Sequence, residues 1–496
     1  MHNISIGKDG AWQDSRKHAI VMAGTSSGVG KTTITIGIMY ALKEKGYKVQ
    51  GFKVGPDYID TSYHTSVTGV ASRNLDPWLM GEDGVIESFS NAMHRSNAEI
   101  AVIEGVMGLY DGLSGKDDYA STAHIAILLN SPVILVLDAS KAARSVAAMA
   151  LGFIEFNREV KVKGVILNNV AGDRHARYCL DALEQRGIPV LGVVKRNKDT
   201  RLKERHLGLV PTYESIKVRD DALATARYVS EHINIDGILD IVNESAPLML
   251  KHTKEMDDYD YDYDYDCYDD RVVVTSDHPY SYSRNEDVTI GVALDESFNF
   301  YYADNLEMLS RYARVVYFSP IHDEEPPECD GLYIGGGFPE VLAPMLASNT
   351  RMMKRIKDYA EDSIPIYAEC GGLMYLSRSI TDADGKYDMV GLIDADTTMI
   401  GRRLTLNYTE ARVDAPSCVI ADHGSIVRGH EFHYSTLVDI AEDSRFAYEM
   451  LRGNGVDGKR DGFIVYNTLA SYMHIHFIHK DIVKRFIDLC RRCSSR

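Results

Sequence analysis

A cysteine followed by two glycines carries the clearest nucleophilic signature in this sequence. Cys370 lies in IPIYAECGGLM (364–374), a pattern that predicts a strand, a sharp turn and a helix. A thiol at such a turn stands at a helix N-terminus, which lowers its pKa and exposes the sulfur. We therefore expect Cys370 to act as a nucleophile rather than as a buried structural thiol.

A thiolate nucleophile needs a base, and two histidines near the C-terminus qualify. His474 and His476 lie in ASYMHIHF (470–477), a strand-like segment that turns both side chains to one face. The residues alone do not decide which of the two is the base. His433 is a further candidate site residue, or a histidine whose role is structural.

Glycines near this cysteine could supply the N–H groups of an oxyanion hole. Gly336 and Gly337 belong to GGGFPE (335–340), which follows a strand-like run, and Gly371 directly follows the cysteine. A plain turn is the alternative interpretation of the first pair, because a short glycine run is a weak signal.

A second reactive segment is AGTSSGVGKTT (23–33), near the N-terminus. It follows an apolar run and opens a helix, as a phosphate-binding loop does. Its N–H groups would hold the phosphates of ATP, Lys31 would reach the β- and γ-phosphates, and the Thr32 hydroxyl would bind Mg²⁺. The expected ATP-binding residues are Thr25, Gly28, Gly30, Lys31, Thr32 and Thr33.

The first residue of this loop is Thr25, where the common pattern has glycine. Partition-type ATPases carry a signature lysine at the position of Ser26, whereas the Thr25 form resembles dethiobiotin synthetase and its relatives, which activate carboxylates. That resemblance implies Mg²⁺ contacts from Asp57 and Glu104, in addition to Thr32. Phosphoryl transfer to a carboxylate brings anions together, so Mg²⁺ and lysine must neutralise their charge.

Other side chains of the same two loops are candidate substrate contacts. These are Tyr58, Asp60 and Asp111. Asp60 and Asp111 could equally bind metal or cap turns. Turn formation is likewise the alternative for Asp57, and an exposed strand end the alternative for Glu104.

Alternating strands and helices must position all these residues. Strands that are apolar throughout, each followed by a helix, predict a parallel sheet covered on both faces. The part from about 385 to 480 is richer in strand signals. The expected strands are 19–24, 49–55, 99–105, 132–139 and 162–170, then 288–295, 313–319, 331–336 and 364–370.

An acidic run, MDDYDYDYDYDCYDD (256–270), separates the two patterns. Like-charge repulsion and the lack of an apolar face predict a solvated linker. We therefore expect an N-terminal tail at 1–16, a P-loop ATP-binding synthetase domain at 17–244, an acidic linker at 245–287 and a second α/β domain at 288–496.

Bulk composition limits the partners and the compartment. The net charge of −18 argues against nucleic-acid and anionic-membrane partners, which need basic patches. The seven cysteines are scattered and odd in number, so they form no disulfide framework. Neither a signal peptide nor a run of about 18 apolar residues is present. We expect a cytoplasmic protein, for which a homodimer is one compatible assembly.

The motifs of both halves together resemble the cobyrinic acid a,c-diamide synthase family. In that family a dethiobiotin-synthetase-like P-loop domain is fused to a class I glutamine amidotransferase domain, so an α/β fold with two domains is implied. The resemblance covers nearly the whole chain, apart from the tail and the acidic linker. The motifs that carry it are KVGPDYID (53–60), EGVMGLYDG (104–112), GGGFPE (335–340), ECGG (369–372), EFHYS (431–435) and SYMH (471–474).

The resemblance implies an ATP- and Mg²⁺-dependent ligase that takes nitrogen from glutamine or ammonia. The family's nucleophile maps to Cys370 and its histidine to His474, with the glycines at the oxyanion and glutamine site. In other class I amidotransferases an acid stands two residues after the histidine; here His476 occupies that place, which resembles a Cys–His dyad. What orients His474 is therefore open.

The implied reaction converts the a and c acetates of a tetrapyrrole into amides through acyl phosphates. The ring is cobyrinate for most of the family and Ni-sirohydrochlorin, toward coenzyme F430, for close relatives in methane-producing archaea. The alternatives are a cobyric acid synthase, which amidates other carboxylates, and a CTP synthase, whose histidine precedes a Pro-Glu that is absent here. A partition-type ATPase switch is opposed by Ser26 and Cys370.

Overall fold

The computed structural model describes most of the chain, in two units. Its described residues are 17–197, 202, 204–205, 208–212, 215–245, 248, 287–399, 404–416 and 418–494. Among them, the first unit comprises 17–77 and 81–248, and the second 78–80 and 287–494. The expected tail at 1–16 and nearly all of the acidic linker, with Cys267, lie outside the described residues. The exact domain boundaries stay a prediction.

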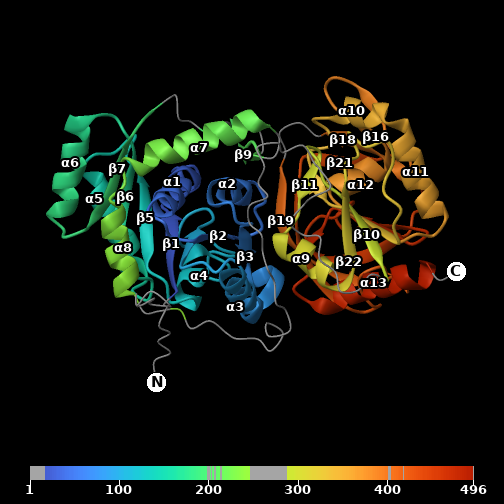
Figure 1. Ribbon diagram of the computed structural model, residues 1–496, viewed down its shortest axis with the longest axis horizontal. Helices are drawn as coiled ribbons and strands as arrows, with labels where there is room; N and C mark the ends of the chain where they lie inside the picture. Colours follow the sequence, from blue (N-terminus) through green and yellow to red (C-terminus); the bar gives the residue numbers. More distant parts are fainter. Residues whose placement is uncertain are drawn as a thin grey trace, which may run out of the picture. The chain divides into compact units, whose positions relative to one another are not determined.

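The strands predicted in the N-terminal half form one parallel sheet. Seven of the described strands pair in the order β3-β2-β4-β1-β5-β6-β7, and every pair is parallel (Figure 1). The central strands are buried on both faces, which explains their continuous apolar sequence. The strands are β1 (His18–Gly24), β2 (Val49–Val54), β3 (Arg73–Leu75), β4 (Ile100–Glu104), β5 (Val133–Asp138), β6 (Val162–Val170) and β7 (Val190–Lys195).

Helices cover both faces of this sheet because the chain moves in both directions from β1. The connection through α1 leads from β1 toward β2, and the one through α4 leads from β4 past β1 to β5. Right-handed crossovers in opposite directions place their helices on opposite faces. The elements are α1 (Lys31–Glu44), α2 (Ile59–Thr68), α3 (Pro77–Arg95), α4 (Thr122–Leu128), α5 (Ser145–Phe156), α6 (Asp173–Glu184), α7 (Ile216–Ser230), α8 (Ile235–Glu244) and a hairpin of β8 (Glu204–Arg205) and β9 (Gly208–Leu209).

A larger mixed sheet forms the centre of the second unit. Its described strands run in the order β12-β10-β13-β15-β24-β23-β22-β19-β20-β25. The first five are parallel and the pairs from β24 to β25 are antiparallel. The strands are β10 (Thr289–Ala293), β12 (Arg314–Phe318), β13 (Gly331–Ile334), β15 (Ile366–Glu369), β19 (Thr405–Val413), β20 (Ile426–His433), β22 (Phe446–Arg452), β23 (Arg460–Val465), β24 (Thr468–Ser471) and β25 (His474–Ile475).

Two smaller sheets complete the strands of this unit. β11 pairs antiparallel with β14, and β17, β16, β18 and β21 form a four-stranded sheet. Their bounds are β11 (Phe298–Phe300), β14 (Gly336–Gly337), β16 (Ser377–Thr381), β17 (Lys386–Asp388), β18 (Ile393–Met399) and β21 (Ser435–Val438).

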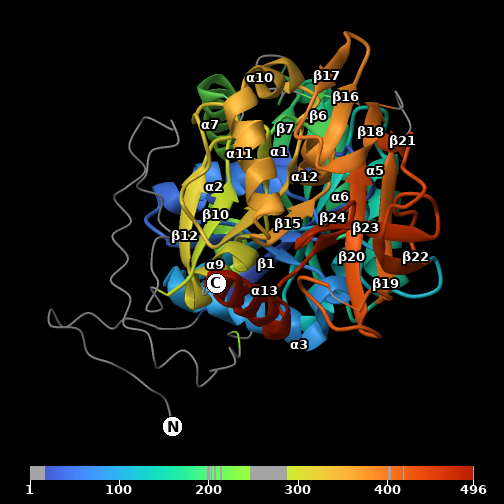
Figure 2. The same cartoon turned by 90° about the vertical axis from the view of Figure 1, so that its right-hand side faces the viewer.

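Alternate residues of the parallel strands feed two cores, one on each face of the large sheet. On β15, Ile366 and Ala368 pack into one core and Tyr367 into the other. In Figure 2, α10 and α11 lie near the top of the drawing and α9 and α13 near the bottom. The helices are α9 (Ala303–Tyr312), α10 (Ala343–Ser348), α11 (Thr350–Glu361), α12 (Gly371–Leu376) and α13 (Lys480–Ser494).

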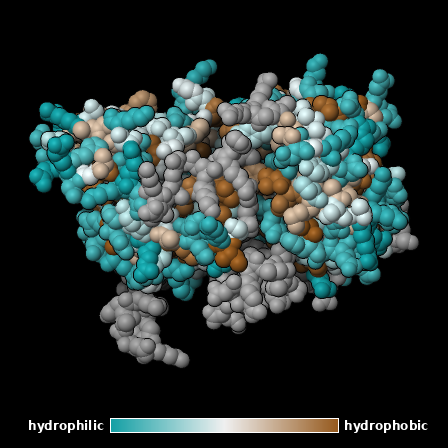
Figure 3. Space-filling model, turned by 90° about the horizontal axis from the view of Figure 1, so that it is seen from above, coloured by the Kyte–Doolittle hydropathy of each residue, from teal (hydrophilic) through white to brown (hydrophobic). Residues whose placement is uncertain are grey.

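Apolar side chains on the molecular surface occur in small groups among hydrophilic residues on the face drawn in Figure 3. Across the part of the chain that the structure describes, no helix has both the length and the apolar character needed to cross a membrane.

Candidate active sites

The predicted phosphate loop connects β1 to α1. Gly30 is the N-cap of α1 and has φ of 91°, a left-handed conformation that glycine adopts without strain. A Cβ atom at Gly30 would lie 2.2 Å from Nδ2 of Asn168, which donates a hydrogen bond to the carbonyl of Val29 at 2.9 Å. Both the backbone angle and this close approach require glycine. Asn168, which supports the loop from β6, was not identified from the sequence.

Lys31 curls back over the loop in which it lies. Its Nζ donates hydrogen bonds to the carbonyl oxygens of Ser26, at 3.2 Å, and Met107, at 2.5 Å. Burial, reinforced by the nearby Lys53, lowers the pKa of Lys31 to about 8. The ammonium group therefore lies next to the loop whose N–H groups would hold phosphates.

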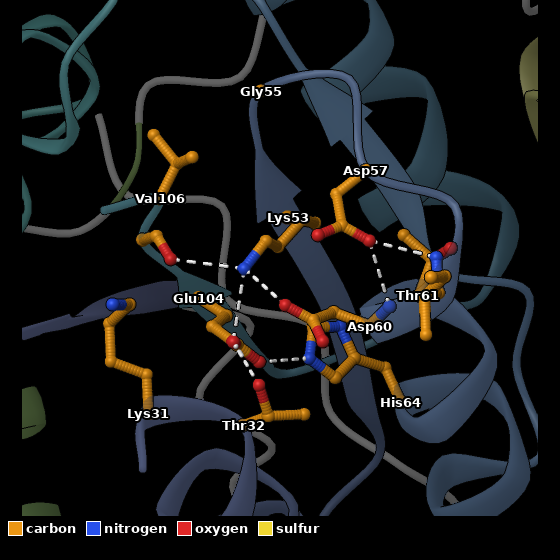
Figure 4. A network of polar contacts seen from close by, with 12 residues as sticks. Lys31, Thr32, Lys53, Gly55, Asp57, Asp60, Thr61, His64, Glu104 and Val106 are labelled. Carbon is orange, nitrogen blue, oxygen red and sulfur yellow. Dashed lines mark hydrogen bonds and ion pairs between the residues drawn. The ribbon is translucent and has the colours of Figure 1, made fainter. Parts of the chain in front are cut away.

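A buried ion-pair network lies beside the phosphate loop, at the carboxyl ends of β2 and β4. Lys53 and Glu104 face each other in the strand register, and Lys53 Nζ lies 3.0 Å from Glu104 Oε1 and 2.5 Å from Asp60 Oδ2. The same Nζ donates to the carbonyl of Gly105 at 3.1 Å. Figure 4 shows these contacts converging on Lys53 and Glu104.

The charges of this network support one another. Burial alone would raise the pKa of Glu104, but Lys53 and His64 hold it well below its ordinary value. Burial likewise disfavours the charged form of Lys53, yet Asp60 and Glu104 raise its pKa. Glu104 is therefore a carboxylate although it is fully buried.

His64 on α2 is a network member that the sequence did not reveal. Its Nε2 lies 2.7 Å from Glu104 Oε2 and its Nδ1 lies 3.1 Å from the hydroxyl of Ser72. Because a carboxylate only accepts, Nε2 donates to Glu104. His64 follows Asp60 by four residues, a helical spacing that could have pointed to it.

Thr32 and Glu104, two of the three predicted Mg²⁺ ligands, lie together here. Thr32 Oγ1 donates to Glu104 Oε1 at 2.7 Å, so two oxygen ligands meet at the start of α1. Asp57 Oδ1 accepts from the N–H groups of Ile59 and Asp60, and Figure 4 shows its other oxygen turned toward Lys53. Oxygen ligands of this kind, few in number, fit Mg²⁺, which keeps several waters and phosphate oxygens in its shell. Within the described residues, no group of three or more acidic, His or Cys side chains is arranged to hold a metal by itself.

The structure separates the three candidate substrate residues. Asp60 belongs to the ion-pair network through Lys53. Asp111 closes the turn after β4, where its Oδ2 accepts from the N–H of Gly108 at 2.9 Å. Tyr58 is buried at the start of α2. Asp57 and Asp111 thus cap turns, as the alternative interpretation stated, and a ligand role for either is compatible with that.

The two threonines that flank the phosphate loop lie at its ends. Thr25 directly follows β1, and its carbonyl oxygen lies near Gly108. Thr33 lies in the first turn of α1.

Cys370 stands between β15 and α12, as predicted, in a strained backbone conformation. Its φ is 47° and its ψ is −95°, a combination that non-glycine residues rarely adopt. The Cys370 N–H donates to the carbonyl of Ser471 at 2.7 Å, and Sγ lies 3.6 Å from the carbonyl oxygen of Phe432. The strain fixes the direction of the sulfur relative to β15.

The expected lowering of the thiol pKa by a helix N-terminus is wrong for this structure. Burial, together with the carboxylates of Glu340 and Glu369, raises the pKa of Cys370 well above its ordinary value. The α12 helix has only six residues, and its N-terminal field does not offset burial. Cys370 is therefore a thiol at neutral pH and needs a base to remove its proton.

His474 packs against the predicted oxyanion glycines, one of which, Gly371, directly follows Cys370. A Cβ at Gly336 would lie 2.4 Å from Cε1 of His474, and a Cβ at Gly371 would lie 3.0 Å from the nitrogen of Gly337. The structure thus packs the imidazole directly against the glycine segment that adjoins Cys370.

The other histidines near the thiol have different surroundings. His476 Nε2 lies 3.4 Å from Asp304 Oδ2, and its Nδ1 accepts from the N–H of Ile478. His433 stacks on Tyr472 with ring centroids 3.8 Å apart, and its Nδ1 donates to the Ser435 carbonyl at 2.9 Å. His476 is therefore paired with an acid of α9, whereas His433 contacts Tyr472, two residues before His474.

Asp461, which was not identified from the sequence, shapes the segment that leads into His474. Its carboxyl group accepts hydrogen bonds from the N–H groups of Gly462, Tyr472 and Met473 at 2.7 to 3.2 Å. Burial raises the pKa of Asp461 to about 7. One carboxyl group therefore fixes the backbone of the two residues that precede the histidine.

Comparison with known proteins assigns a family to each half of the chain. A nucleotide-binding domain model described as CobQ/CobB/MinD/ParA matches residues 20–210, and a CobB/CobQ-like glutamine amidotransferase domain model matches residues 289–482.

Three relatives that match over more than nine-tenths of this chain are each named cobyrinate a,c-diamide synthase. The cobyrinate a,c-diamide synthase of Methanosarcina acetivorans is 40% identical over 479 residues, covering 92% of this chain and 92% of the relative. That of Methanothermobacter thermautotrophicus is 42% identical over 459 residues, covering 92% and 96%. That of Dehalococcoides mccartyi is 42% identical over 483 residues, covering 95% and 98%.

Proposed function

The chain belongs to the cobyrinate a,c-diamide synthase family, and on that premise we propose that it amidates the a and c acetate carboxylates of a tetrapyrrole. It is a glutamine-hydrolysing ligase with a nucleotide-binding domain. The proposed ring is cobyrinate, Ni-sirohydrochlorin or both, in the synthesis of cobalamin or coenzyme F430. The proposed co-substrates are ATP with Mg²⁺ and either glutamine or ammonia.

In the glutaminase half, Cys370 attacks the side-chain amide carbon of glutamine. His474 takes the proton from Sγ and gives it to the departing nitrogen, which leaves as ammonia. N–H groups of Gly336, Gly337 and Gly371 stabilise the oxyanion of the tetrahedral intermediate. Water then hydrolyses the thioester, releasing glutamate and restoring the thiol. The buried, protonated state of Cys370 supports this order, because the base must act before the sulfur can attack.

In the synthetase half, the loop from Thr25 to Thr33 binds the phosphates of ATP. The substrate carboxylate attacks the γ-phosphorus, which forms an acyl phosphate and releases ADP. Lys31, which lies against the phosphate loop, neutralises the charge of the transferred phosphoryl group, whereas Lys53 holds Asp60 and Glu104. Ammonia then attacks the acyl carbon and displaces phosphate, leaving an amide. Each ring thus consumes two ATP and two glutamine molecules.

Thr32 and Glu104 would hold Mg²⁺, with Asp57 as the further proposed ligand. When bound, the ion would neutralise charge on the β- and γ-phosphates. Lys53 and His64 hold the carboxylate of Glu104 in place beside Thr32.

The observation that carries the proposal is the identity of about 40% to cobyrinate a,c-diamide synthases over more than nine-tenths of both chains. The sequence motifs do not distinguish cobyrinate from Ni-sirohydrochlorin. The experiment is therefore designed to identify the ring that is amidated.

The test offers purified protein ATP, Mg²⁺ and glutamine carrying ¹⁵N in its amide group, with cobyrinate or Ni-sirohydrochlorin in parallel reactions. Mass spectrometry counts the labelled amides and NMR assigns their positions. Two amides, at the a and c acetates, are expected on at least one ring. Amides at other corrinoid carboxylates would favour cobyric acid synthase chemistry, and unlabelled product with both rings would contradict the proposal.

A further inference from the structure

We propose that Glu369 is the acid that orients His474, in place of the acid that other class I amidotransferases carry two residues after the histidine. The proposal rests on the glutaminase roles proposed for Cys370 and His474. Glu369 is the last residue of β15 and directly precedes the nucleophile, so no spacing rule in the sequence points to it.

The carboxylate of Glu369 and the imidazole of His474 lie next to each other in the protein interior. Glu369 Oε2 is 3.7 Å from His474 Nδ1, and the two side chains are 1% and 0% exposed. That distance is an ion-pair separation, longer than a hydrogen bond. Catalytic hydrogen bonds are commonly long without substrate and shorten in the reacting complex.

Three donors fix the position of the Glu369 carboxylate. The hydroxyl of Tyr333 donates to Oε2 at 2.9 Å, the hydroxyl of Tyr367 donates to Oε1 at 2.6 Å, and the N–H of Ile475 donates to Oε1 at 2.9 Å. The last bond ties Glu369 to the backbone directly after His474. The carboxylate is thus held in register with the histidine whose ring it faces.

The other polar side chains of this region contact partners other than His474 Nδ1. Asp304 faces His476, and Asp461 accepts three backbone N–H groups. His430 stacks on His474 with ring centroids 4.8 Å apart, but burial lowers its pKa, so it is neutral and supplies no negative charge.

This arrangement assigns the two nitrogens of His474. A carboxylate facing Nδ1 keeps the proton on that nitrogen and leaves Nε2 to accept the proton of the Cys370 thiol. When Nε2 takes that proton, the resulting imidazolium is stabilised by Glu369. The proton then passes to the nitrogen that leaves glutamine, and Glu369 itself exchanges no proton.

The first test is Glu369→Gln in the full-length protein. With the amide oxygen in the place of Oε1, Tyr367 and the Ile475 N–H still donate to it, and the Tyr333 hydroxyl can turn to accept from the new NH₂ group. The change therefore preserves volume and hydrogen bonding. We expect the glutaminase kcat to fall about 100-fold or more, as when a triad acid becomes an amide, while the KM for glutamine changes less than about threefold. Amidation with added ammonium, which bypasses this site, reports that the variant is folded.

The matched control is Asp304→Asn, which makes the same change beside His476. We expect it to leave the glutaminase kcat within about twofold of the wild type. An equal loss in both variants would overturn the proposal, because it would show a general effect of removing a buried or partly buried carboxylate.

The second test asks whether Glu369 acts through His474. The rate at which iodoacetamide alkylates Cys370, measured by mass spectrometry, should fall in Glu369→Gln. In the His474→Ala background, where only the direct effect of the Glu369 charge on the thiol remains, adding Glu369→Gln should leave this rate unchanged or raise it. Equal slowing in both backgrounds, or a wild-type kcat in Glu369→Gln, overturns the proposal. If Glu369→Gln does not fold, Glu369→Asp replaces it, because this change withdraws the carboxylate by one methylene. A wild-type kcat in Glu369→Asp would then overturn the proposal. Glutaminase activity surviving in Cys370→Ser would instead refute the proposed glutaminase site.

Discussion

Lys53 and Glu104 stand opposite each other on neighbouring strands, with the ammonium nitrogen 3.0 Å from the carboxylate oxygen. Both side chains are almost completely buried, and the carboxylate also contacts Thr32 and His64. A buried charge is tolerated only when it is paired and hydrogen-bonded. The pair therefore keeps a charged Glu104 beside the phosphate loop.

The first prediction is that Lys53→Met destabilises the first unit and abolishes ATP-dependent amidation. Breaking a buried pair by removing one partner costs about 3–5 kcal/mol, because the remaining carboxylates are left uncompensated. Thermal melts and amidation assays with ammonium measure the two effects. The control is Lys45→Met, which removes an exposed pair with Asp236 and should change stability by no more than about 1 kcal/mol. Equal destabilisation by the two changes would contradict the importance given to burial.

The second prediction concerns His64, which holds Glu104 from the side opposite Lys53. His64→Ala should raise the Mg²⁺ concentration needed for tight ATP binding by about 10–100-fold, as loss of a residue that orients a metal ligand does. ATP binding measured by calorimetry without Mg²⁺ should change little. His124→Ala, a change at a less buried histidine of the same unit, serves as the control. An unchanged Mg²⁺ requirement in His64→Ala would separate His64 from the metal.

The third prediction is that Cys370→Ser loses glutamine-dependent amidation but keeps amidation with added ammonium. Serine lacks the nucleophilicity of the thiolate, whereas the synthetase chemistry needs only ammonia. Product formation with each nitrogen source is the measurement. Lys31→Ala is the converse variant and should lose both activities, because Lys31 serves the phosphates. Loss of both activities in Cys370→Ser would contradict two separable reactions.

The fourth prediction follows from the buried, neutral state of His430. Burial, reinforced by His474, lowers the pKa of His430 well below its ordinary value of about 6.5. Above pH 6.5 the imidazole is neutral in both the folded and the unfolded state, so it adds no pH dependence. As the pH falls below about 6.5, the unfolded chain binds a proton that the folded protein refuses, and stability falls by up to about 1.4 kcal/mol per pH unit.

His430→Gln should therefore make the thermal midpoint of the second unit less sensitive to pH between 7 and 5. Carboxylates also titrate toward the lower end of this range, so the comparison is the difference in slope between the variant and the wild type. Equal slopes of the thermal midpoint against pH in the variant and the wild type would show that His430 does not cause this pH dependence.

The sequence predicted the strands that matter most for both sites. The apolar runs at 19–24, 99–105 and 364–370 became β1, β4 and β15, because strands buried on both faces need such runs. β3, with only Arg73–Leu75, was missed because three residues show no periodicity.

The partners of the site residues were harder to predict than the site residues. His64 reaches Glu104 from a helix 40 residues earlier in the chain, and Asp461 reaches Tyr472 from a neighbouring strand. Such contacts depend on strand order and register, which local patterns do not encode. The sign of the Cys370 pKa shift was mispredicted for a related reason: the helix terminus is visible in the sequence, and the burial that outweighs it is not.

The protonated state of Cys370 has a consequence for the resting protein. Oxidants and electrophiles attack thiolates far faster than thiols. A nucleophile that is buried and keeps its proton until a base removes it is thus shielded from chemical damage between turnovers.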